Sequence, residues 1–277
     1  MENFDSTSKI ILYIFFVIML VIFLRYTFKM VEMAYVLKFK KPLYNHFYFN
    51  LKKLSKEEKS VLKNQFPFYN KLTDKEKRYF EHRISSFIND KDFIGREGFD
   101  ITDEIKVLIS ATAIMLTFGF RDFYIDFISK IVIYPNEFFS NTNSVYHKGE
   151  FNPKLKTLVL SWEDFKLGFD DGNDNLNLGI HEFTHAIHLN SIKNRDVSST
   201  IFSDSFKELT AFIARNESLR IKLIDSGYFR EYAFTNQFEF LSVLIENFIE
   251  TPNDFRALFP DIYDKTKQML NFNFAGY

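Results

Sequence analysis

The stretch His181-Glu182-Phe183-Thr184-His185 is the most informative part of this sequence. On an α-helix, two histidines four residues apart lie on one face, so both imidazoles can reach a single metal ion. Glu182 then faces the attacking water, which is the HExxH arrangement of a zinc hydrolase. The residues around the motif favour a buried helix over a solvated helix with two surface histidines, because they are apolar: Leu176, Leu178, Ile180, Ala186 and Ile187.

A catalytic zinc ion usually has three protein ligands, so a third ligand must come from elsewhere in the chain. Glu208 lies at the sequence distance that is typical of thermolysin-like enzymes. Glu239 is the other candidate, because it shares one polar face with Ser242 and Glu246 on an otherwise apolar helix. A carboxylate directed into a core needs a partner, and a metal ion or its histidine ligands would be one. The expected core-facing residues of that helix are Phe238, Leu241, Leu244, Ile245 and Phe248.

Several further segments make the chain recognisable. In order along the sequence they are Phe99–Ile109, Ile131–Phe138, Leu160–Trp162, the HEFTH motif and Tyr232–Glu239. Together they resemble the Mlc titration factor A family of zinc-dependent peptidases, whose catalytic fold is related to that of anthrax lethal factor. The resemblance extends from Phe66 to Phe272, which is most of the chain.

The resemblance implies that Glu239 is the third metal ligand and that Tyr232 is an active-site tyrosine. One position departs from the family pattern, because His188 stands where the family usually has an aspartate. The helix rises about 10 Å between His181 and His188, whereas zinc–nitrogen bonds are about 2 Å long, so one ion cannot readily bind both. We therefore expect His188 beside the metal ligands or at the rim of the cleft.

These residues predict a reaction mechanism. Zn²⁺ held by His181, His185 and Glu239 would make hydroxide available near neutral pH. Glu182 would remove the proton from the water and later deliver it to the leaving amine. Tyr232 would help to stabilise the oxyanion, unless it is an ordinary core tyrosine. The same ligand set is also compatible with cobalt or manganese.

The amino-terminal region predicts a membrane anchor. Residues from Ile10 to Leu24 are all apolar, and a helix from Ser8 to Phe28 would be about 31 Å long, close to the thickness of a bilayer core. The positive residues follow this run: Arg25, Lys29, Lys38, Lys40 and Lys41. By the positive-inside rule, the amino terminus lies outside and the rest of the chain lies in the cytoplasm, at a bacterial inner membrane. The alternative is a cleaved signal peptide, which the acidic start at Glu2 and Asp5 disfavours.

The expected organisation has three parts. Residues 1–29 form the transmembrane anchor, 30–65 a basic juxtamembrane linker and helix, and 66–277 a zincin-like peptidase domain. Capping-box spacings at Ser55/Glu58 and Thr73/Glu76 each predict the start of a helix, and strands are expected at 131–134 and 157–162. The second strand is either an edge strand that can pair with an extended substrate or an interior strand. The fold class is therefore α+β, dominated by helices and with a small sheet.

Composition narrows the class of function. The net charge of −1 argues against a nucleic-acid partner, and the absence of cysteine excludes disulfides and thiolate zinc ligands. We expect a membrane-anchored zinc peptidase that acts on peptides or proteins. The alternative, suggested by the family's namesake, is a membrane-tethered protein that binds a transcriptional regulator. The presence of the water-activating Glu182 favours catalysis, because a protein that only binds has no need of it.

Overall fold

The computed structural model describes residues 5–140, 145–170, 172 and 174–277. Glu2, which was used as evidence against a cleaved signal peptide, lies outside this range. The chain forms two compact units, Met1–Leu43 and Tyr44–Tyr277.

The first unit is a single long helix, α1 (Ser6–Phe39). Its start is capped by Asp5, whose carboxylate accepts a hydrogen bond from the backbone N–H of Ser8 at 2.7 Å. Every side chain from Ile10 to Leu24 is exposed. Among the described residues, α1 is the helix that is long and apolar enough to cross a membrane, and a signal sequence near an amino terminus has the same properties.

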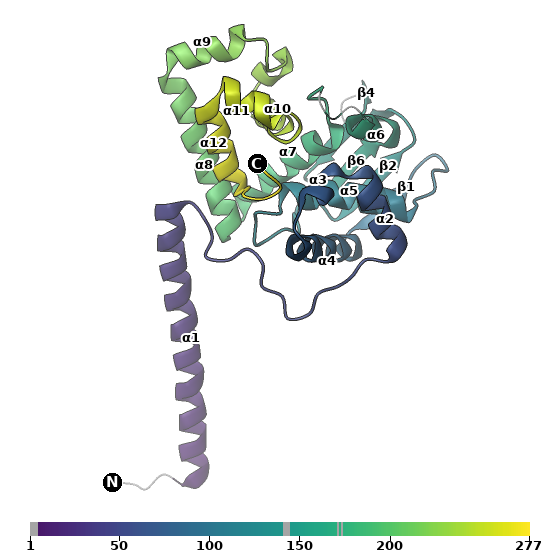
Figure 1. Ribbon diagram of the computed structural model, residues 1–277. Coiled ribbons are helices and arrows are strands. Elements are labelled where there is room, and N and C mark those ends of the chain that lie inside the picture. Colours follow the sequence, from purple (N-terminus) through teal and green to yellow (C-terminus); the bar gives the residue numbers. More distant parts are fainter. Residues whose placement is uncertain (1–4, 141–144, 171, 173) are drawn as a thin grey trace. The chain divides into compact units, whose positions relative to one another are not determined.

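The second unit is dominated by helices and contains a small mixed sheet, which confirms the expected fold class (Figure 1). Its first half contains α2 (Lys56–Gln65), α3 (Pro67–Lys71), α4 (Asp74–Asp90), β1 (Asp92–Gly95), α5 (Asp103–Leu116), β2 (Lys130–Tyr134), β3 (Phe138–Ser140), β4 (Val145–His147), β5 (Gly149–Asn152), β6 (Thr157–Ser161) and α6 (Trp162–Asp170). Its second half contains α7 (Leu178–Lys193), α8 (Val197–Arg215), α9 (Glu217–Asp225), the 3₁₀ helix η1 (Glu231–Phe234), α10 (Gln237–Glu250), α11 (Pro252–Leu258) and α12 (Pro260–Leu270).

The helix starts that were read from capping boxes are confirmed. Ser55 and Thr73 are the N-caps of α2 and α4, and in both boxes the glutamate three residues later bonds back to the backbone of the cap. The second unit begins at Tyr44, earlier than residue 66, where the peptidase domain was expected to start. The reason is that Leu54 and Leu62, which lie in the predicted linker, are buried in its core.

The four-stranded sheet has the order β1-β2-β6-β5. Strands β1, β2 and β6 are parallel, and β5 runs antiparallel to β6, with Gly149 opposite Leu160. The predicted strand at 157–162 is therefore interior. Among the described residues β5 forms the edge beside it, and its sequence Gly-Glu-Phe-Asn gave no strand signal because it is short and contains Gly, Glu and Asn, which are uncommon in strands.

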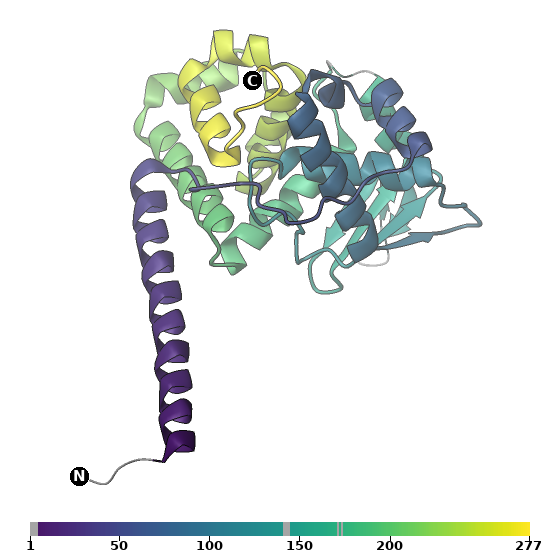
Figure 2. The ribbon, with the colours of Figure 1, turned by 60° about the horizontal axis from the view of Figure 1, so that its bottom comes forward.

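Helix α7 carries the HExxH motif and packs on nearly all sides. It contacts α5, α8 and α10 as well as strands β5 and β6. Figure 2 shows the strands of the sheet on one side of the second unit and the green and yellow helices on the other. Gly179 allows close packing at the start of α7, because a Cβ there would lie 2.5 Å from the ring of Phe165. The motif is thus held on a rigid, buried helix, with Ile180, Phe183 and Ile187 in the core.

Candidate metal centre

Three side chains from two helices meet at one point. His181 and His185 extend from α7 and Glu239 from α10, and their ligand atoms all lie within 4.8 Å of one another. The distances are 3.1 Å between the two Nε2 atoms, 2.9 Å from His181 Nε2 to Glu239 Oε2, and 3.5 Å from His185 Nε2 to Glu239 Oε2. Two ligand atoms on one tetrahedral zinc ion are about 3.3 Å apart, so this donor set fits such an ion.

The start of α10 explains the position of Glu239. Asn236 caps the helix, with its side-chain oxygen accepting hydrogen bonds from the backbone N–H groups of Phe238 and Glu239. Glu239 therefore lies in the first turn, beside α7. The other candidate, Glu208, lies on an exposed part of α8, away from this group. The expectation that Phe238 faces the core is wrong, because its side chain is 49% exposed.

His181 has a carboxylate on the far side of its ring. Oε1 of the fully buried Glu246 lies 2.7 Å from His181 Nδ1. The same carboxylate accepts hydrogen bonds from both terminal nitrogens of Arg230, at 2.8 and 3.0 Å, and from the backbone N–H of Asn177 at 3.0 Å. With its proton on Nδ1, His181 presents the lone pair of Nε2 to a cation, as metal-binding histidines do.

His185 is oriented by a hydroxyl group. Ser242 Oγ lies 3.3 Å from His185 Nδ1 and also donates to the backbone carbonyl of His181 at 3.2 Å. The polar face of α10 thus lies along α7: Glu239 faces the two Nε2 atoms, while Ser242 and Glu246 face the two Nδ1 atoms. This arrangement satisfies the polar groups that the sequence places in an apolar helix.

The charges of this group favour a cation. Burial lowers the pKa of His181, but hydrogen bonds with Glu239 and Glu246 outweigh burial and raise that pKa to about 9. Burial raises the pKa of Glu239, yet hydrogen bonds with His181 and His185 hold that pKa well below its usual range. The carboxylates therefore stabilise positive charge at this point.

Glu182 lies next to the edge strand. Its side chain is buried, and burial raises its pKa, an effect that the neighbouring histidines partly offset. A Cβ at Gly149 would lie 2.7 Å from Cγ and 2.8 Å from Oε1 of Glu182. Only glycine therefore lets the start of β5 pass this close to the carboxylate.

Tyr232 lies on η1 at the same site. Its ring centroid is 6.0 Å from that of His181, and the side chain is half-exposed, so it is not a core tyrosine. Burial, followed by the carboxylate of Glu239, raises the pKa of Tyr232, which keeps the phenol protonated at neutral pH. His181, Glu182 and Tyr232 line one cleft of about 540 Å³, together with Gly149.

His188 does not lie at the rim of this cleft. Its side chain is buried, and its ring is 4.9 Å from that of Phe206, 5.0 Å from that of Phe238 and 6.3 Å from that of Phe202. Burial lowers the pKa of His188 to about 4, and its Nδ1 has no hydrogen-bond partner among the residues that the structure describes. The expectation that His188 lies beside the metal ligands or at the cleft rim is therefore wrong. His188 is a neutral histidine in an aromatic pocket.

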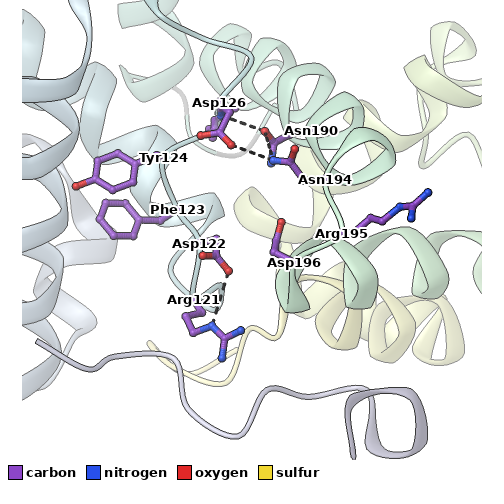
Figure 3. Close-up of a pocket in the computed structure, with 10 residues that line it drawn as sticks. Arg121, Asp122, Phe123, Tyr124, Asp126, Asn190, Asn194, Arg195 and Asp196 are labelled. Carbon is purple, nitrogen blue, oxygen red and sulfur yellow. Dashed lines mark hydrogen bonds and ion pairs between the residues drawn. The ribbon is translucent and has the colours of Figure 1, made fainter. Parts of the chain in front are cut away.

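A second pocket lies near the carboxyl-terminal end of α7 (Figure 3). There Asp126 accepts a hydrogen bond from Asn194 at 3.1 Å, and its backbone N–H donates to Asn190 at 3.0 Å. None of the three candidate metal ligands lines this pocket. These hydrogen bonds join the 121–126 loop to the end of α7.

Three residues of the site escaped the sequence analysis. Asn177 caps α7, and an Asn directly before an apolar helix is a readable signal. Arg230 lies 49 residues from His181 and 16 from Glu246, so no local pattern reveals it. Gly149 carries no signal of its own, because its role depends on Glu182 being opposite.

Comparisons with known proteins agree with this geometry. The family described as Glucose-regulated metallo-peptidase M90 matches residues 44–271. This confirms the resemblance read from the motifs, and the match begins at Tyr44, the first residue of the second structural unit. The chain is also 24% identical over 213 residues to the uncharacterised protein slr2042 of Synechocystis sp. (strain ATCC 27184 / PCC 6803 / Kazusa), covering 69% of this chain and 74% of that protein.

Proposed function

The chain belongs to the glucose-regulated metallopeptidase M90 family, and from this premise we propose that it is a membrane-anchored, zinc-dependent peptidase with His181, His185 and Glu239 as metal ligands. The observation that carries the proposal is the convergence of these three ligand atoms within 4.8 Å. Two imidazoles and one carboxylate form the ligand set of a catalytic zinc site that keeps a position open for water or substrate.

A metal ion held there would supply Lewis-acid activation of a water molecule and of the peptide carbonyl. Cobalt or manganese would suit the same donors. Glu246 and Ser242 hold the two imidazoles in the orientation that metal binding requires.

Glu182 and Tyr232 carry the proton and charge chemistry. Glu182 takes a proton from the attacking water and delivers it to the leaving amine, and its raised pKa suits both tasks. The protonated phenol of Tyr232 donates a hydrogen bond to the carbonyl oxygen as negative charge develops there. An extended peptide that pairs with the free edge of β5 would pass directly beside Glu182, because Gly149 begins that strand.

We assign α1 the role of a single membrane span. The apolar run and the lysines that follow it favour a location of the second unit in the cytoplasm, at the inner membrane of a bacterium. The substrates are then cytoplasmic peptides or proteins.

The experiment that tests the ligand set is a measurement of metal content by mass spectrometry on the purified full chain. The parent and Glu208→Ala are expected to hold one zinc ion per chain, and Glu239→Ala is expected to lose most of it. Equal zinc in both variants would overturn the ligand assignment. A parent that holds no metal even after zinc is supplied would favour the alternative, a tethered protein that binds a transcriptional regulator.

The catalytic role of Glu182 is tested separately. Glu182→Gln keeps the size of the side chain but cannot accept a proton, so we expect peptide cleavage to fall by at least about 100-fold while zinc is retained. Cleavage at the parental rate would refute the mechanism.

A further inference from the structure

The segment that opens the second unit alternates between partly buried and exposed aromatic side chains. The ring of His46 stacks on Tyr79 at 4.7 Å, and the hydroxyl of Tyr48 accepts a hydrogen bond from Arg83 Nε at 2.6 Å. Phe47 and Phe49 point the opposite way, with 68% and 96% of their side chains exposed. His46 and Tyr48 thus fix the segment on the domain. Phe47 and Phe49 are apolar at positions where a surface segment would normally carry polar residues.

The exposed rings form one patch. Phe47 and Phe49 contact each other edge to face at 5.1 Å, and Tyr44 joins Phe47 at 6.2 Å. We call Tyr44, Phe47 and Phe49 the aromatic patch. An exposed group of large rings on a soluble surface marks a site of interaction, because leaving it in water is unfavourable.

The charged residues that flank the aromatic patch in the sequence are all of one sign. Between Glu32 and Glu57 the chain carries six lysines and no acidic residue. The six are Lys38, Lys40, Lys41, Lys52, Lys53 and Lys56. Aromatic rings with flanking lysines are the composition of a protein surface that lies in the headgroup layer of an anionic membrane.

We propose that the aromatic patch binds the interfacial layer of an anionic lipid bilayer, as a membrane contact of the second unit that is separate from α1. The inference rests on the proposed anchoring by α1. The length of chain permits it: residues 29–39 extend the helix by about 16 Å beyond the span of residues 8–28, and the eight residues from Lys40 to Phe47 can span about 26 Å. A second copy of the chain is a poor occupant, because it would bring two groups of lysines together.

The test uses the full chain in lipid nanodiscs with a single tryptophan. Trp162, the one native tryptophan, is replaced in the variant Trp162→Phe. Reporters are then introduced one at a time as Phe49→Trp in the patch, Ile18→Trp in α1 and Phe139→Trp on strand β3, where Phe139 is half-exposed. Quenching of fluorescence by lipids brominated along the acyl chain shows which reporter contacts the bilayer.

We expect strong quenching of Ile18→Trp, clear quenching of Phe49→Trp in anionic nanodiscs, and little quenching of Phe139→Trp. If Ile18→Trp is quenched but Phe49→Trp is quenched no more than Phe139→Trp, the inference is overturned and the anchoring proposal stands. No quenching of Ile18→Trp would instead remove the anchoring proposal on which it rests. Protection of Phe49→Trp from aqueous acrylamide without lipid quenching would identify a protein as the occupant and overturn the inference.

The lipid charge provides a second measurement. We expect quenching of Phe49→Trp to fall at least twofold when phosphatidylglycerol is replaced by phosphatidylcholine, because the lysines would lose their anionic partners. Equal quenching in both lipids would refute the role of the lysines. Cleavage of a soluble peptide serves as the control for folding, since none of the three reporter positions lines the cleft.

Discussion

The Nδ1 atom of His181 lies 2.7 Å from Oε1 of Glu246, while Nε2 of the same ring lies 2.9 Å from Oε2 of Glu239. One imidazole is therefore held between two carboxylates of one helix, seven residues apart. The inner carboxylate is buried and bonded to Arg230, and the outer one is partly exposed. Glu246 orients the ring, and Glu239 lies at its Nε2 side, which would face the proposed metal ion.

Replacing Glu246 should weaken metal binding without removing a ligand. In Glu246→Gln the amide cannot match both the His181 Nδ1–H and the two Arg230 donors, so we expect zinc affinity to fall about 10- to 100-fold. Competition with a chromophoric chelator measures this. Glu217→Gln, on the exposed surface of α9, is the matched control. An unchanged affinity in Glu246→Gln would mean that Glu246 has no part in orienting His181.

A side chain at Gly149 should affect catalysis more than metal binding. The added methyl group of Gly149→Ala would collide with the carboxylate of Glu182, and displacement of a catalytic group by about 1 Å can cost about 100-fold in rate. We expect kcat to fall by at least tenfold with zinc content unchanged. The control is Gly172→Ala, where a Cβ meets no atom within 4 Å. Parental kcat in Gly149→Ala would show that Glu182 can move away at no cost.

Glu250 should make stability depend on pH. Burial raises the pKa of Glu250 to about 8 and outweighs the hydrogen bond from the Asn177 side chain at 3.0 Å, which lowers that pKa. Between about pH 4.5 and 8 the unfolded chain has lost this proton and the folded chain keeps it, so stability falls as pH rises. Glu250→Gln mimics the protonated acid and should remove this loss. Urea unfolding at pH 5, 6.5 and 8 should show the variant gaining on the parent by up to about 1.4 kcal/mol per pH unit. A constant difference across this range would refute the prediction.

His188 should be replaceable by an apolar residue. The pKa of His188 is about 4 in the folded chain and about 6.5 in the unfolded chain. Between these pH values the unfolded chain binds a proton and the folded chain does not, so the parent loses stability as pH falls from 6.5 to 4. His188→Leu removes that loss and the unpaired Nδ1. We expect its urea midpoint to exceed that of the parent at pH 5 by more than at pH 7, with full zinc content. Loss of zinc in this variant would mean that His188 supports the metal site after all.

The local features of this chain were readable from its sequence. The spacing of His181 and His185 predicted a helix that carries both histidines on one face, and the capping boxes at Ser55 and Thr73 located two helix starts. For the third ligand, the pattern alone left Glu208 and Glu239 open. The polar face that Glu239 shares with Ser242 and Glu246 already favoured Glu239, and the family resemblance implied it, but nothing local tells which helix returns to α7.

The tertiary structure decided which distant groups meet. Glu246 reaches His181 across 65 residues, and Gly149 lies against Glu182 because β5 forms the sheet edge beside α7. His188 shares the motif helix, yet its side chain enters a pocket of phenylalanines from α8 and α10. Helical periodicity and capping act over three to seven residues and are written in the sequence itself. Packing of separate helices and strands brings together residues with no sequence relationship, so the surroundings of each ligand emerge only in the folded chain.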